Sequence, residues 1–271
     1  MPAKGTKQRP KNRASMSDLV PGLQGVLFIG LMVILSIAGI LLMRRFAPQA
    51  MLAQHNELAG FVIAVVGVVY AVLLAFMALA AWERFGQAEI RTYDEANNLA
   101  NLYRDVGPLP RGHQMRSEII AYTNTVVADE WPKMRSGGES AQANMQLEQV
   151  GRELRHVHVA NAGQQDLQMD ALARLNTVLL DRDDRLSMSA DALPRMIWIV
   201  LLCGAAVTIG FTFLFGFQRL ELHIITTSLL AITIGLSLFL IYSVDAPFAR
   251  GISIEPRAFE RALHTYELVG R

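Results

Sequence analysis

The stretch from Gly60 to Glu95 constrains the fold of this chain more than any other segment. It begins as an apolar run without a charge, and its first charged residues, Glu83 and Arg84, come directly after Trp82. No proline interrupts the stretch, and beyond Arg84 it continues as an amphipathic segment. The pattern predicts one long helix, partly in lipid and partly in water, with Trp82, Glu83 and Arg84 at the membrane boundary.

Three further apolar runs are long enough to cross a hydrocarbon core of roughly 30 Å. The first, Gly25 to Met43, contains no charged residue. The other two extend from about Met196 to Phe217 and from about Leu222 to Ser243, with only a short polar connection between them. Together with Gly60 to Trp82, they predict four transmembrane helices in two hairpins, in keeping with a composition that is 52% hydrophobic.

The spans divide the chain into five parts. Residues 1–18 form a basic arm that we expect to be disordered. Transmembrane hairpin 1 covers residues 19–82 and hairpin 2 covers residues 196–245. Between the hairpins lies a polar region, residues 83–195, and residues 246–271 form a C-terminal tail with a short helix. Four spans place both termini on the same side of the membrane.

The distribution of Lys and Arg predicts which side that is. Only Arg44, Arg45 and Arg219 lie in the two short loops, whereas the arm, the polar region and the tail carry the other basic residues. The termini and the polar region should therefore be cytoplasmic. The polar region holds 13 basic and 17 acidic residues, which argues against nucleic-acid binding. The single cysteine, Cys203, lies in an apolar run and excludes a disulfide framework.

Helical periodicity dominates the polar region, and no segment has the alternation of a strand. The first helix continues from Trp82 to Val106 and is ended by Gly107-Pro108-Leu109-Pro110. Its inward positions are Phe85, Ala88, Thr92, Ala96, Leu99, Tyr103 and Val106. Three more helices follow, whose inward positions are Ile119, Ile120, Thr123, Val126, Val127 and Met134; Leu147, Val150, Leu154 and Val157; and Met169, Leu172, Leu175, Leu179 and Leu186. We therefore expect an all-α membrane protein with a cytoplasmic helical bundle between spans two and three.

No motif indicates catalysis or a metal site. His156 and His158 are two residues apart, so a helix directs them to different faces, unlike the i, i+4 spacing of helical metal ligands. The charged run from Asp181 to Arg185 is more typical of a solvated helix end with surface salt bridges than of a cation site. We predict that the protein is not an enzyme and holds neither a cofactor nor a metal.

Two faces of the second span carry the functional hypotheses. Small side chains on one face would let another helix approach closely, and the third span repeats this spacing. These candidate packing residues are Gly60, Ala64, Gly67, Ala71 and Ala75, with Gly204, Thr208 and Thr212. About a third of a turn away, Phe61, Val65 and Val69 begin a bulky stripe that continues to Phe76. The stripe either faces lipid, which is the simpler interpretation, or lines a pore with a hydrophobic constriction.

A set of short motifs resembles a known family. The motifs are Tyr70 with Trp82-Glu83-x-Phe85-x-x-Ala88, Glu95-Ala96, Tyr122, Glu130-Trp131-Pro132, Arg185-Leu186, Leu193-Pro194 with Trp198, and Asp245-x-Pro247-Phe248. Their order and spacing, over about residues 25–268, are similar to the DUF4239 family of bacterial bestrophin-like membrane proteins. The more distant likeness to true bestrophins rests on Val65 to Tyr70, which resembles the apolar neck of those channels.

The resemblance implies a pentameric anion channel in the bilayer, with cytosolic termini and a neck lined by Phe61, Val65 and Val69. Two features depart from bestrophins: Ala80-Ala81-Trp82 replaces their basic-aromatic cluster after the neck, and no dense acidic clasp for calcium is present. We therefore expect a homo-oligomeric channel that passes small anions. The alternative is a non-conducting membrane scaffold or sensor whose helical bundle recruits a partner.

Overall fold

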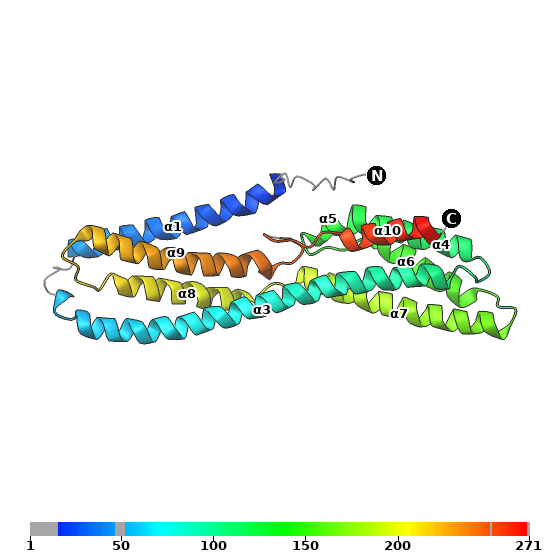
Figure 1. Ribbon diagram of the computed structural model, residues 1–271, viewed down its shortest axis with the longest axis horizontal. Helices are drawn as coiled ribbons and strands as arrows, with labels where there is room; N and C mark the ends of the chain where they lie inside the picture. Colours follow the sequence, from blue (N-terminus) through cyan, green and yellow to red (C-terminus); the bar gives the residue numbers. More distant parts are fainter. Residues whose placement is uncertain (1–15, 47–51, 250, 270–271) are drawn as a thin grey trace, which may run out of the picture.

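The computed structural model describes residues 16–46, 52–249 and 251–269, and all regular structure in these ranges is helical (Figure 1). This confirms the predicted all-α class. The basic residues of the predicted arm lie outside the described ranges. In chain order, the helices are α1 (Met16–Phe46), α3 (Asn56–Asp105), α4 (Gly112–Thr125), a π-helical turn (Val126–Glu130), α5 (Trp131–Met134), α6 (Ala141–His156), α7 (Ala162–Ala190), α8 (Arg195–Thr212), α9 (Leu220–Asp245) and α10 (Arg257–Val269).

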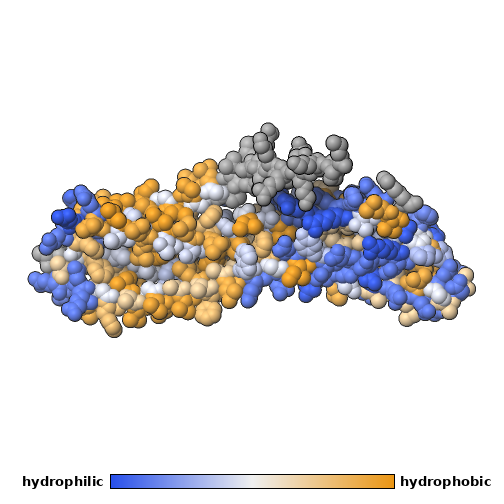
Figure 2. All heavy atoms as spheres, in the orientation of Figure 1, coloured by the Kyte–Doolittle hydropathy of each residue, from blue (hydrophilic) through white to orange (hydrophobic). Residues whose placement is uncertain are grey.

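Four helices are long and apolar enough to cross a membrane: α1 from Gly22 onward, α3, α8 and α9. Their apolar parts occupy one half of an elongated molecule, and the face seen in Figure 2 is mostly hydrophobic over this half and mostly hydrophilic over the other. In the apolar half, α1 packs mainly against α9, and α3 packs against both α8 and α9. The chain is therefore a multi-pass membrane protein in which the last span holds the other three together.

Helix α3 is continuous from Asn56 to Asp105, as the uninterrupted sequence pattern predicts. At 1.5 Å per residue, its 50 residues span roughly 75 Å, which is more than twice the thickness of a hydrocarbon core. Its first half packs among the spans, and its second half packs along α7 in the polar half of the molecule. One rigid helix thus connects the membrane part to the helical domain, which we define as residues 83–192 together with α10.

The third span is shorter than predicted. The apolar run continues to Phe217, but α8 ends at Thr212, and a turn with tighter backbone hydrogen bonds, from each N–H to the carbonyl three residues before it, follows as far as Phe215. Side chains from neighbouring segments bind this backbone. The amide of Asn56 donates to Gly216 O at 3.2 Å and accepts from Gly216 N at 2.9 Å, and Arg44 Nη2 donates to Phe217 O at 2.8 Å. These bonds replace those a longer helix would make, so hydropathy alone overestimated its length.

The core of the helical domain agrees with the inward positions predicted for its first three helices, which are buried or partly buried. The fourth helix, α7, differs from its prediction because Met169 and Leu179 are exposed. Leu175 is buried as predicted, and Leu172 and Leu186 are partly buried. The buried face also carries Ala171 and Val178, and then charged side chains. The prediction followed the largest apolar residues, whereas the face that α7 packs along α3 includes small and charged ones.

The C-terminal helix α10, which the sequence placed in a tail, belongs to this core. Phe259 is fully buried, and Tyr266 stacks on Tyr103 of α3 with ring centroids 4.4 Å apart. Trp131 packs edge-on against Phe259, and its indole Nε1 donates to Ile254 O at 3.1 Å. The helix therefore packs against α3 and α4 and adds a fifth helix to the expected four-helix bundle.

A π-helical turn, Val126–Glu130, distorts the second domain helix directly before Trp131 and Pro132. Pro132 lies in the first turn of α5, where a missing backbone N–H is best tolerated. The wider turn brings Glu130 inward, and its side chain is completely buried. A carboxylate in that position needs a buried cation, and α7 supplies one.

Candidate pore-lining helix and the charge cluster beyond it

The bulky stripe on α3 faces outward from the chain. Phe61, Val65 and Val69 are 71%, 53% and 66% exposed, and Val72 and Phe76 continue the stripe toward the domain. Helix α3 meets α8 and α9 through other positions, among them the buried Tyr70 and Leu74. The stripe is therefore open to lipid, to a pore or to another subunit, and its role as a neck remains a prediction.

The small-residue face of α3 is also open. Ala64, Ala71 and Ala75 are exposed, and a Cβ added at Gly60 or Gly67 would meet no atom within 4 Å. A shallow hollow of about 340 Å³ runs between this face and α9. No other helix of this chain therefore packs closely at Gly60 or Gly67. The predicted packing role of this face would require a neighbouring molecule.

The candidate packing residues on α8 do make contacts within the chain. The ring of Tyr70 lies so close over Gly204 that a Cβ there would clash with it, and the Tyr70 hydroxyl donates to Leu201 O at 2.8 Å. The buried Thr208 donates to Gly204 O at 2.7 Å, and the Thr212 hydroxyl accepts from Thr227 of α9 at 3.3 Å. Glycine at position 204 thus allows α3 to approach α8.

The predicted membrane boundary lies where the apolar and polar halves meet. Trp82 is 58% exposed, and its ring stacks on Phe85 with centroids 6.1 Å apart. Glu83 is exposed, whereas Arg84 donates from Nη2 to Asp191 O at 3.1 Å. An exposed tryptophan beside charged residues is the arrangement found at lipid headgroups.

A buried carboxylate, Asp245, joins the two helices of hairpin 2 at this boundary. Its side chain accepts a hydrogen bond from Leu193 N at 2.7 Å and another from Trp198 Nε1 at 3.4 Å. Asp245 ends α9, and the two donors flank the start of α8. The bonds therefore hold the domain-side ends of the last two spans at a fixed separation, and they satisfy a backbone N–H that precedes Pro194.

Beyond the boundary, the helical domain encloses a cluster of charged side chains that the sequence analysis did not identify. Arg185 is fully buried at its centre. Its Nε donates to Glu95 Oε2 at 2.6 Å, and its Nη2 donates to Glu130 Oε1 at 2.8 Å. Arg182 Nη2 donates to Glu130 Oε2 at 2.6 Å, and the Tyr122 hydroxyl donates to Glu95 Oε1 at 2.7 Å. These five residues, termed the charge cluster, connect α3, α4, the π-helical turn and α7.

Electrostatics keep Glu130 and Arg185 ionised. Burial by itself raises the pKa of Glu130, but the positive charges of Arg185 and Arg182 outweigh it and lower this pKa below its ordinary value. Burial opposes the charge of Arg185, but the Glu95 carboxylate outweighs that effect and raises the arginine pKa. Burial and the Glu95 carboxylate both raise the pKa of Tyr122, so its hydroxyl remains a donor.

The interpretation of Asp181 to Arg185 as a solvated helix end is wrong. Asp181, Arg182 and Arg185 are buried, whereas Asp183 is exposed and Asp184 is partly exposed. The first three share a face of α7, since i, i+1 and i+4 lie close around a helix. A signal was present in the sequence: Glu95 lies on the buried face of the first domain helix, and a buried carboxylate requires a paired cation. His156 and His158 are exposed, as expected.

Acid should destabilise the helical domain through Glu130. Because the folded-state pKa of Glu130 is lower than its ordinary value of 4.5, its carboxylate stabilises the fold fully above about pH 4.5. This stabilisation is lost as the pH falls through the lowered folded-state pKa. The melting temperature of the purified protein, measured from pH 7 downward, should therefore fall steeply below about pH 4.5.

Two variants isolate this effect. Glu130→Gln removes the titrating carboxylate, so its melting temperature starts lower at neutral pH and then declines less steeply in acid. Glu139→Gln changes an exposed glutamate and should follow the wild-type curve. Equal acid slopes for all three proteins would contradict the assignment to Glu130.

Comparisons with known proteins agree with this architecture. A family model described as the bestrophin-like domain matches residues 30–259. A search of curated proteins found no significant match. Among solved structures, two single-residue variants of a bacterial bestrophin homolog from Klebsiella pneumoniae each superpose with a TM-score of 0.69 at 14% identity. The aligned regions cover 90% and 92% of this chain, and 99% and 100% of the respective homolog chains.

A third structure of the Klebsiella homolog gives a TM-score of 0.67 at 14% identity, over 91% of this chain and 98% of the homolog. At this level of identity, the solved structures establish the fold and nothing finer. The family match covers most of the chain, including most of the first span, the whole of the other three spans and the charge cluster. The chain therefore belongs to the bestrophin-like family.

Proposed function

We propose that the protein is a homo-oligomeric membrane channel that passes small anions through a hydrophobic neck formed by Phe61, Val65 and Val69 of each subunit. One observation carries the proposal: these side chains remain outside the protein core although α3 has two packing partners within the chain. They recur every four residues, so a ring of α3 helices would stack three apolar layers about 6 Å apart. Such a constriction controls ion passage by its width and wetting.

The oligomer proposal rests on the open small-residue face. Gly60 and Gly67 have empty space where a Cβ would stand, which suits close approach by a helix of another subunit. Five subunits follow from the bestrophin resemblance. Within the family, the motif order favours the DUF4239 group. The excess of Lys and Arg in the arm supports cytoplasmic termini in a bacterial inner membrane.

Shortening the neck side chains should increase anion flux. Val65→Ala and Val69→Ala each widen the apolar constriction, so chloride or iodide flux into liposomes should exceed that of the wild type. Val26→Ala, at an exposed position on α1, serves as the control and should leave flux unchanged. Wild-type protein that carries no flux and has a monomeric mass would rule out the channel.

A non-conducting scaffold or sensor is the second candidate. One observation favours it: the stripe from Phe61 to Phe76 offers no charged or hydroxyl side chain that would select an ion. Single cysteines separate the two candidates when they are placed in a Cys203→Ser background, at position 65 on the bulky stripe or at position 71 on the small-residue face. A channel requires crosslinks between subunits from position 65, around a central axis, whereas a scaffold in which the stripe faces lipid gives none there.

A further inference from the structure

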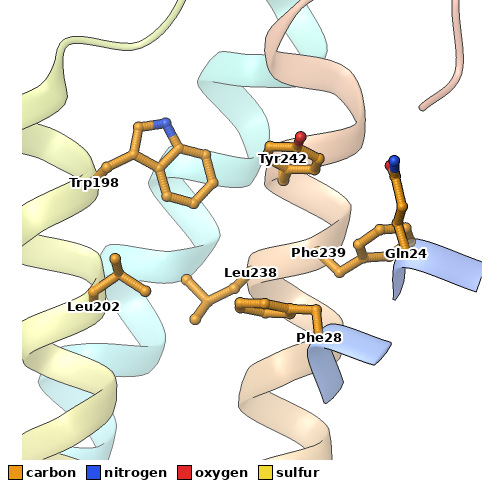
Figure 3. Close-up of a pocket in the computed structure, with 7 residues that line it drawn as sticks. All are labelled: Gln24, Phe28, Trp198, Leu202, Leu238, Phe239 and Tyr242. Carbon is orange, nitrogen blue, oxygen red and sulfur yellow. The ribbon is translucent and has the colours of Figure 1, made fainter. Parts of the chain in front are cut away.

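Figure 3 shows an apolar hollow of about 490 Å³ between α1, α8 and α9, within the membrane-spanning part of the chain. Leu238 of α9, which is completely buried, lies at its back. Phe28 of α1 and Leu202 of α8 lie on either side of Leu238. These three side chains give the hollow an apolar floor and two apolar walls.

Each of the three helices adds a further lining residue, one turn closer to the helical domain. These residues are Gln24 of α1, Trp198 of α8 and Tyr242 of α9, four positions from Phe28, Leu202 and Leu238 respectively. The indole Nε1 of Trp198 already donates to Asp245. Gln24 is exposed, so its amide can donate to a molecule in the hollow. The hollow is thus apolar in its depth and amphipathic at its domain-side end.

Two contacts between an aromatic ring and a glycine hold α1 beside the hollow. The ring of Phe239, on α9, lies so close over Gly25 that a Cβ there would clash with it. Phe213, directly after the end of α8, covers Gly39 in the same way. The second contact joins α1 to the far end of α8, and closer to the domain the hollow lies between these two helices. The gap is therefore part of the packed structure.

The hollow lies on the side of α9 that faces away from α3. Leu238 and Tyr242 line it, whereas Thr233, Ser237 and Leu240 line the shallow hollow between α9 and α3. The two sets occupy roughly opposite faces of the helix. A pore lined by α3 would therefore leave this hollow on the periphery of the assembly, and a protein without a pore would present it to the bilayer as well.

We propose that this hollow binds one acyl chain of a phospholipid from the leaflet next to the helical domain. The part of the chain nearest its ester lies between Phe28 and Leu202, because water in an apolar cavity would lack polar partners. The ester carbonyl accepts a hydrogen bond from the Gln24 amide. Trp198 and Tyr242 lie at the same level, where aromatic side chains suit the membrane interface.

The hollow recognises the chain and its ester, and not the headgroup. No charged residue is among the described residues that line it, so the charge of the headgroup should not affect binding. A channel and a scaffold would both present this hollow, and the site therefore does not depend on the proposed function. A neighbouring subunit is the competing occupant, and lipid binding to the assembled protein distinguishes the two.

Native mass spectrometry of the delipidated full chain in detergent tests the site, with added phosphatidylglycerol or phosphatidylcholine of identical acyl chains. We expect one phospholipid per subunit, with equal affinity for the two headgroups. A diether analogue of phosphatidylcholine, which lacks the ester carbonyl, should bind about fivefold more weakly, the effect of one hydrogen bond. Gln24→Leu should weaken binding of the ester lipid by the same factor and leave binding of the diether lipid unchanged.

A second pair of variants tests the apolar part. Leu202→Trp fills the hollow and should abolish binding of every lipid, whereas Val207→Trp, at an exposed position on the opposite face of α8, should bind like the wild type. The same spectra report the assembly mass, so a variant that misassembles is recognised, and the Gln24 comparison then decides. A wild-type protein that binds no lipid, a preference for one headgroup, or equal binding by Leu202→Trp and Val207→Trp would each overturn the proposal.

Discussion

Replacing Arg185 with methionine is expected to lower the free energy of unfolding by about 3–5 kcal/mol. The substitution roughly preserves side-chain volume, but Glu95 loses its only ion-pair partner in the described structure and Glu130 retains only Arg182. A buried carboxylate without a cation is costly, because the protein interior replaces little of the hydration that it loses. Chemical denaturation of the detergent-solubilised protein, followed by tryptophan fluorescence, measures the loss. Trp131 is a local reporter, since the Arg185 guanidinium lies 5.4 Å from its ring.

The matched control is Arg152→Met. Arg152 pairs with Glu148 at 3.6 Å on the surface of α6, and both side chains are more than half exposed. Its removal should cost less than about 1 kcal/mol, because water screens exposed pairs. If Arg185→Met costs no more than this control, buried charge pairing does not hold the domain together.

A double variant separates pairing from packing. Glu95→Gln keeps an acceptor for the Tyr122 hydroxyl but removes the charge that Arg185 neutralises. Combined with Arg185→Met, it should lose less stability than the two single losses added together, by about 0.5–3 kcal/mol. Strict additivity would show that the two side chains do not stabilise each other.

The second large effect is expected at Asp245. Asp245→Ala should lower the free energy of unfolding by about 1.5–3 kcal/mol, since it removes the carboxylate that accepts from Leu193 N and Trp198 Nε1. The Leu193 N–H would then be buried without an acceptor. Hydrogen exchange measured by mass spectrometry should show faster exchange in the segment between α7 and α8, in addition to the lower denaturation midpoint.

Two substitutions control this result. Asp245→Asn retains one acceptor oxygen and should lose less stability than the alanine variant. Asp191→Ala removes an exposed carboxylate, whereas the bonds of this residue to Arg84 and to Ser187 O are made by its backbone, so the change should be nearly neutral. Similar losses for Asp191→Ala and Asp245→Ala would show that the bonds to Asp245 do not stabilise the junction.

The charge cluster acts on the helix that would line a pore, and Asp245 acts on the two spans that pack against this helix. The charge cluster fixes the domain half of α3 against α7, and Asp245 fixes the domain-side ends of α8 and α9. Because α3 is continuous, a displacement of its domain half would be transmitted to Phe61, Val65 and Val69. The variants above therefore also provide a way to ask whether the domain influences flux.

Much of the architecture could be predicted because lipid imposes simple requirements. A charge-free run must form a helix that satisfies its own backbone, so Gly60 to Trp82 could be assigned without knowledge of its neighbours. Helical periodicity also predicted the buried faces of three domain helices. The method failed where a buried face is charged: α7 packs through Asp181, Arg182 and Arg185, which carry no hydrophobic signal. The prediction of where α8 ends was wrong for a related reason. The side chains of Asn56 and Arg44, which are distant in sequence, bind the backbone of the turn that follows α8.

The sequence by itself determined the local properties of this protein: its helical class, its four spans, the continuity of α3 and the two faces of that helix. These follow from hydropathy, periodicity and the absence of helix breakers, which act over a few residues. Only the tertiary structure decided which distant residues meet. It brought Glu95, Tyr122, Glu130 and Arg185 into one buried cluster and joined Leu193 to Asp245. The physical reason is that a buried charge depends on partners from other helices, whose positions no local pattern specifies.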